Sequence, residues 1–129
     1  MSRALALPLT LALFAAASGA RALPGMDSGT ASGFAACAGR LASLIEVQTF
    51  AAPDAVPQTR QQRDMMLDLM EASMPLGTGR ALELLQLEAK MAQDDLLMRA
   101  RTDPDPRMAR AALRRADREI AACRAMILS

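Results

Sequence analysis

Two cysteines constrain the fold of this chain more than any other feature. Cys37 and Cys123 are the only cysteines in its 129 residues. Each lies in a stripe of apolar residues that recurs at helical spacing. Because a disulfide requires Cα atoms within about 7 Å of each other, a bridge between them brings together two segments that are far apart in the sequence.

The apolar stripes and the proline- and glycine-containing breaks between them predict four helices. Pro53 and Pro57 interrupt the first pattern, "MPLGTG" ends the second and "TDPDPR" ends the third. Ser32, Thr78 and Asp105 are candidate N-caps. The expected helices run from Gly33 to about Phe50, from about Pro57 to Met74, from Thr78 to about Arg101 and from Pro106 to about Leu128.

The expected inner faces follow from the 3.6-residue period. They comprise Phe34, Cys37, Leu41, Leu44, Ile45 and Gln48 in the first helix; Met66, Leu69, Met70 and Met74 in the second; Leu82, Leu85, Ala89, Ala92 and Leu96 in the third; and Ala109, Leu113, Ala116, Ile120, Cys123 and Ile127 in the fourth.

Composition supports an all-α fold. Helix-forming residues dominate, tryptophan and tyrosine are absent, and no segment alternates β-branched and polar residues. In a bundle whose helices run up and down in turn, the start of the first helix and the end of the fourth lie at the same end. The predicted fold is therefore a small antiparallel four-helix bundle in which a Cys37–Cys123 disulfide joins these two ends.

Other roles for the cysteines fit less well. A lipid-modified cysteine would directly follow the apolar leader, whereas a polar stretch precedes Cys37. Two thiolates without any histidine do not form a typical zinc or copper site. Neither cysteine has the C-x-x-C spacing of a redox motif.

The first residues indicate export. One arginine, an apolar run and then small residues form the pattern of a signal peptide at residues 1–22, with cleavage before Leu23 and a second possible site after Ala20. The apolar run would rise only about 21 Å as a helix, too short for a hydrocarbon core of about 30 Å. We expect a flexible mature N-terminus at 23–32, one helical domain at 33–129, no transmembrane segment after cleavage, and a location in the periplasm or the medium.

No pattern of catalytic or cofactor-binding residues is present. The chain lacks histidine, glycine-rich phosphate loops and metal motifs, so no catalytic residue, cofactor or metal site is assigned. The acid–base candidates Glu46, Glu83, Glu88, Asp94 and Asp95 lie on helices, where carboxylates usually face solvent. Near-neutral charge and the shortage of stacking aromatics argue against nucleic-acid binding.

Methionine offers an alternative function. Ten methionines are present, and Met66, Met70 and Met74 lie one turn apart on the second helix. Thioethers bind Cu(I), so this stripe is a hypothetical site for periplasmic copper handling. Methionine also fills gaps in cores that contain few aromatic residues.

The favoured function is non-catalytic protein binding, as an accessory or adaptor module. The third helix has a second apolar stripe that Glu88 and Asp95 interrupt, and the fourth has a row of arginines opposite its inner face. This surface would bind a protein partner in the cell envelope or a second copy of the chain, although the stripe also fits a contact with a neighbouring helix. Its residues are Leu84, Leu87, Met91, Met98, Arg107, Arg110, Arg114 and Arg118.

Overall fold

The computed structural model describes residues 30–128, which form an all-α domain. Its helices are α1 (Ala31–Ala51), the short 3₁₀ helix η1 (Pro53–Ala55), α2 (Val56–Ser73), α3 (Gly79–Thr102) and α4 (Pro106–Leu128), and this part of the chain contains no strand. The four expected helices are confirmed, with ends that differ by at most a few residues. The expected signal peptide and most of the expected flexible N-terminus lie outside the described residues.

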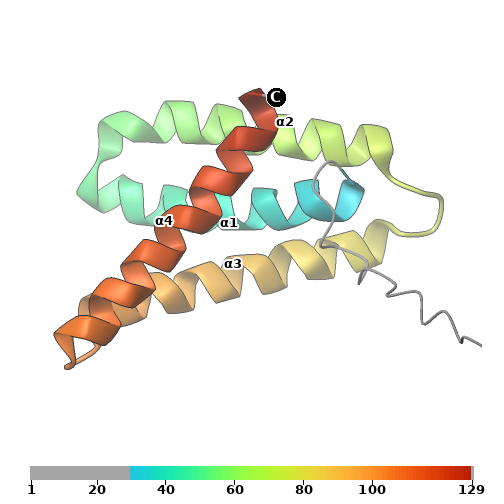
Figure 1. Cartoon of the computed structure of the whole chain (residues 1–129). Helices are drawn as coiled ribbons and strands as arrows, with labels where there is room; N and C mark the ends of the chain where they lie inside the picture. Colours follow the sequence, from blue (N-terminus) through green and yellow to red (C-terminus); the bar gives the residue numbers. More distant parts are fainter. Residues whose placement is uncertain (1–29, 129) are drawn as a thin grey trace, which may run out of the picture.

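α1 is the central element of the fold. α2 and α3 lie along opposite sides of it, and α4 crosses obliquely over a third side (Figure 1). In Figure 1, α2 runs back along α1 and α3 back again, while α4 returns obliquely, so that the early part of α1 and the late part of α4 meet at the Cys37–Cys123 bond. Its central position explains why α1 is rich in alanine and glycine, because small side chains allow neighbouring backbones to approach closely.

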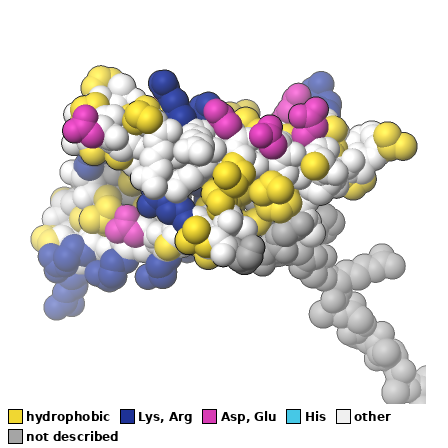
Figure 2. All heavy atoms as spheres, turned by 90° about the horizontal axis from the view of Figure 1, so that it is seen from above, with side chains coloured by type: hydrophobic (Ala, Val, Ile, Leu, Met, Phe, Trp, Pro, Cys, Tyr) yellow, Lys and Arg dark blue, Asp and Glu magenta, His cyan; other side chains and the backbone are white. Residues whose placement is uncertain are grey.

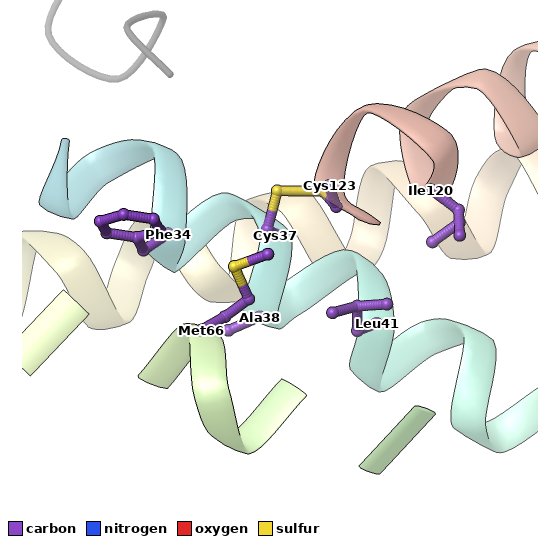
Figure 3. Close-up of a cluster of buried hydrophobic side chains, with 7 residues drawn as sticks. All are labelled: Phe34, Cys37, Ala38, Leu41, Met66, Ile120 and Cys123. Carbon is purple, nitrogen blue, oxygen red and sulfur yellow. A yellow bond between two sulfur atoms is a disulfide. The ribbon is translucent and has the colours of Figure 1, made fainter. Parts of the chain in front are cut away.

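The disulfide lies inside the main hydrophobic core. Cys37 in α1 and Cys123 in α4 are bonded, with their Cα atoms 5.4 Å apart. The predicted link between the start of the first helix and the end of the fourth is therefore confirmed. Figure 3 shows how side chains from α1, α2 and α4 surround the bond. The buried residues of this core are Phe34, Cys37, Ala38, Leu41, Met66, Ile120 and Cys123.

Local side-chain interactions fix two of the helix starts. The hydroxyl of Thr30 accepts a hydrogen bond from the Gly33 backbone N–H, so α1 begins two residues before the expected start, and Thr30 rather than Ser32 is its cap. Asp105 accepts from the Arg107 N–H at 2.9 Å, as expected for the cap of α4. Thr78 precedes α3, but its hydroxyl donates to the Pro75 carbonyl instead of capping the helix.

Gly39 permits the closest approach between α1 and α3. A Cβ atom at this position would collide with the carbonyl oxygen of Gln86 and lie 3.1 Å from the backbone nitrogen of Lys90. No larger residue fits without separating the two helices. The position of α3, and of every side chain on it, therefore depends on this glycine.

Three predicted inner-face positions are wrong. Met74 lies at the end of α2 and is 40% exposed, Ala92 faces solvent, and Leu113 is 46% exposed. In α4 the buried residue is Ala112 in place of Leu113. Because α4 crosses α3 obliquely, a small residue at the crossing allows closer helix packing than leucine would.

Candidate functional site

The outer face of α3 exposes four large apolar side chains. The opposite face of the helix packs into the protein through Leu82, Ala89 and Gln93, all of which are buried. The outward residues are between 52% and 60% exposed, and we refer to them as the α3 stripe: Leu84, Leu87, Met91 and Met98. Their spacing of three, four and seven residues places them on one side of the helix.

Two hollows lie between α1 and α3 beside this stripe. The first has a volume of about 260 Å³ and is bordered by α2 as well. It is lined by Ala38, Gly39 and Ala42 of α1, Arg63 and Leu67 of α2, and Glu83, Gln86, Leu87 and Lys90 of α3. The second has a volume of about 460 Å³, and its lining includes Val47, Phe50, Leu97 and Met98. The stripe therefore borders surface depressions that can receive side chains from another molecule.

A polar network separates the two hollows. The ammonium group of Lys90 lies 3.0 Å from the carboxylate of Glu46 in α1 and 2.9 Å from that of Asp94 one turn along α3. The hydroxyl of Ser43 donates to the other oxygen of Asp94 at 2.5 Å. These contacts connect α1 and α3 at the middle of the stripe and fix the relative position of the hollows.

The network has the wrong electrostatics for serine catalysis. Hydrogen bonds to Asp94 and then Glu46 raise the pKa of Lys90 above its ordinary value, which stabilises the ammonium form. A lysine that activates a serine must instead be neutral and needs a lowered pKa. Ser43 is also completely buried. The arrangement of these groups is therefore explained by helix–helix packing.

The structure does not join the α4 arginines to the α3 stripe. Arg107, Arg110, Arg114 and Arg118 are all exposed on the outer face of α4. The inner face of α4 meets α3 where Gln93 donates to the Ala116 carbonyl. Both the stripe and the arginines point away from this contact, so they form two separate surfaces.

The three methionines of the copper hypothesis occupy different environments. Met66 is fully buried in the core, and its packing alone explains its presence. The sulfur of Met70 lies 3.4 Å from the side-chain amide nitrogen of Gln86. Met74 is exposed at the end of α2.

Sequence reasoning missed Phe50 and the Ser43–Lys90 network. Phe50 was expected only as a helix end, yet it is 91% exposed and lines the larger hollow. Lys90 is the only lysine of the chain, and its spacing from Asp94 is that of a helical ion pair. That spacing is a usable sequence signal for one contact of the network. Nothing in the sequence indicates the contacts with α1.

Comparisons with protein-family models, curated proteins and solved structures find no match. Within residues 30–128, no cluster of three or more histidine, cysteine or acidic residues is suited to hold a metal ion. In the same range, no helix has both the length and the apolar character required to cross a membrane. Function is therefore inferred from the surfaces of the described helices.

Proposed function

We propose that this chain is an exported, non-catalytic helical module that binds a protein partner through the α3 stripe and the two hollows beside it. The observation that carries the proposal is the exposure of four large apolar side chains on one helix face. A group of exposed large apolar side chains on one helix face typically marks an interaction site, and here only Glu88 and Asp95 interrupt it.

The geometry fits an amphipathic helix as the binding element. Leu84 and Met98 are separated by fourteen positions, which corresponds to about 21 Å along a helix axis. A partner helix lying beside α3 would cover this length and place apolar side chains in both hollows. The ion pairs of Lys90 lie between the two hollows and would be covered by the middle of such a helix, where their charges already neutralise one another.

The charges on α3 indicate which residues of the partner helix would flank its apolar side. Between residues 83 and 95, α3 has four acidic residues and a single lysine, and that lysine is already paired with Glu46 and Asp94. Glu83 and Glu88 have no ion pair within the described residues. Lysine or arginine beside the apolar side chains of the partner would therefore complement this face.

Export is supported by two observations. The sequence begins with the pattern of a signal peptide, and the buried disulfide is typical of proteins from oxidising compartments.

The proposal can be tested by site-specific crosslinking followed by titration. A photoreactive side chain at position 91 should capture a partner from the native envelope or culture fluid, whereas one at position 108 on α4 should not. The purified partner is then titrated with the L87A/M91A variant, for which we expect at least tenfold weaker binding, because two central apolar contacts are lost. The M108A/L113A variant, which removes comparably exposed apolar residues from α4, should bind normally.

Melting temperatures separate binding from folding. The L87A/M91A variant should melt close to the unmodified protein because both side chains are largely exposed. A large drop would assign them to the core and refute the proposal. Equal binding by both double variants would also refute it, and crosslinking only to further copies of the chain would identify self-association instead.

A further inference from the structure

Four arginines form a row along the outer side of α4. Arg107, Arg110, Arg114 and Arg118 recur at steps of three and four residues, so they lie along one side of the helix for about 16 Å. None of them forms an ion pair within the described part of the chain. We call these residues the α4 row. Nearby Arg115, by contrast, lies 3.9 Å from the carboxylate of Glu119.

Charge is distributed unevenly between α4 and the other helices. Residues 106–128 include six arginines and two acidic residues, whereas residues 30–105 include seven basic and eleven acidic ones. Figure 2 shows basic side chains gathered at the end of the molecule where α4 begins, while most of the visible acidic side chains lie along the opposite edge. This separation creates an electrostatic dipole that would turn the α4 row toward a negatively charged surface.

The surroundings of the α4 row favour an extended surface over a protein pocket. On the outer side of α4 the row is flanked by small side chains at Ala111 and Ala121 and by one exposed carboxylate at Asp117. The exposed Met108 and Leu113 lie to its sides. The hollows beside α4 are lined by Ala112 and Arg115 on one side and by Ala125 and Arg124 on the other, and among the described residues neither is lined by the α4 row. A protein interface normally buries apolar anchors in pockets. The row itself is made of arginines alone, and the apolar side chains of the hollows, such as Met108, lie beside it.

We propose that the α4 row binds the surface of a membrane that contains anionic phospholipids. The guanidinium groups contact lipid phosphates, and α4 lies parallel to the membrane because its apolar side is already buried against α1 and α3. The protein adsorbs electrostatically and does not insert. This proposal is independent of partner binding by the α3 stripe, which lies on another face.

Vesicle flotation tests the proposal with the purified protein. Vesicles of phosphatidylcholine mixed with phosphatidylglycerol should bind it, and vesicles of phosphatidylcholine alone should not. The R110Q/R114Q/R118Q variant should bind the anionic vesicles about 100-fold more weakly, at about fivefold for each arginine removed. The matched control R60Q/R80Q/R101Q loses the same net charge from exposed positions on α2 and α3, and its binding should change little. Added salt should weaken binding by screening.

Three results would overturn the proposal. The first is equal binding to neutral and anionic vesicles. The second is an equal loss in the two triple variants, which would show that net charge alone matters. The third is binding of an acidic peptide such as polyglutamate, with the same dependence on the α4 row, but no binding to anionic vesicles. The L87A/M91A variant should bind vesicles normally, so failure of one proposal is distinguishable from failure of the other.

Discussion

The side-chain amide of Gln93 in α3 donates a hydrogen bond to the carbonyl oxygen of Ala116 in α4, at 3.2 Å. Both residues are buried, and this contact lies where α4 crosses α3. A polar side chain with one hydrogen bond thus helps to set the position of a helix whose neighbouring inner residues are mainly alanines. The contact leads to a first prediction about stability.

Replacing Gln93 with alanine should lower the free energy of unfolding by about 2 to 3 kcal/mol, because the change removes a buried hydrogen bond and leaves a cavity. Methionine at this position keeps most of the volume and should cost only about 1 kcal/mol. Urea denaturation measures both values. Exposed Gln61 provides the control, and an effect of Q93A no larger than that of Q61A would show that the contact contributes nothing.

The glycine at the α1–α3 contact gives a second prediction. G39A should destabilise the protein by about 1 to 3 kcal/mol or more, because the new methyl group collides with the backbone of α3. G79A, at the start of α3, is the matched control: its methyl group would meet only the sulfur of Met74, at 3.8 Å. Alanine is the better helix former, so G79A should be neutral or slightly stabilising. Thermal melts that rank the two variants in the reverse order would contradict the close approach.

Reduction of the disulfide gives a third prediction. Closing a loop of about 87 residues in the unfolded chain should stabilise the native state by up to about 4.6 kcal/mol, which is comparable with the whole stability of a small domain. We expect a large fall in melting temperature with dithiothreitol and no alkylation of the native protein before reduction. Two reactive thiols in the purified native protein would contradict the bond.

The loss of stability at alkaline pH should be caused by Lys90. Its pKa is raised in the folded state, so its ion pairs stabilise the protein fully below the ordinary value of 10.5, and this contribution is lost as the pH rises through the folded pKa. The loss should stay below about 1 kcal/mol because the group is partly exposed to solvent.

Few other groups titrate in that range, since the chain has no other lysine and no tyrosine. Urea denaturation between about pH 9.5 and 11.5 should therefore show the decline in the unmodified protein. K90M should not show it, and K90R should keep its stability because arginine remains charged. The same slope in all three proteins would refute this assignment.

The sequence predicted the helices and the disulfide because both depend on short-range patterns. Proline, glycine and capping residues mark the breaks, and the apolar period places both cysteines on inner faces. Crossing angles depend on how whole helices pack, and no local pattern encodes them. The 3.6-residue period therefore assigned Leu113 to the inner face, whereas the oblique crossing buries Ala112.

Buried polar residues were harder to predict for the same reason. Gln93 follows no apolar pattern, and its role depends on a carbonyl group of another helix. The sequence showed the α3 stripe as a second apolar row. It could not show that the stripe is exposed, because no local pattern tells whether another helix covers it. The hollows beside it depend on Phe50 and on the spacing of α1 and α3.

The position of the disulfide also determines how the molecule responds to mechanical tension. When the chain is pulled by its two ends, the force passes from Cys37 to Cys123 through the covalent bond between their sulfur atoms. α2 and α3 lie entirely within the bypassed loop, so neither is stretched. Among the described helices, only the first turns of α1 and the last turn of α4 can unravel, and the faces formed by the rest of the domain keep their shape under load.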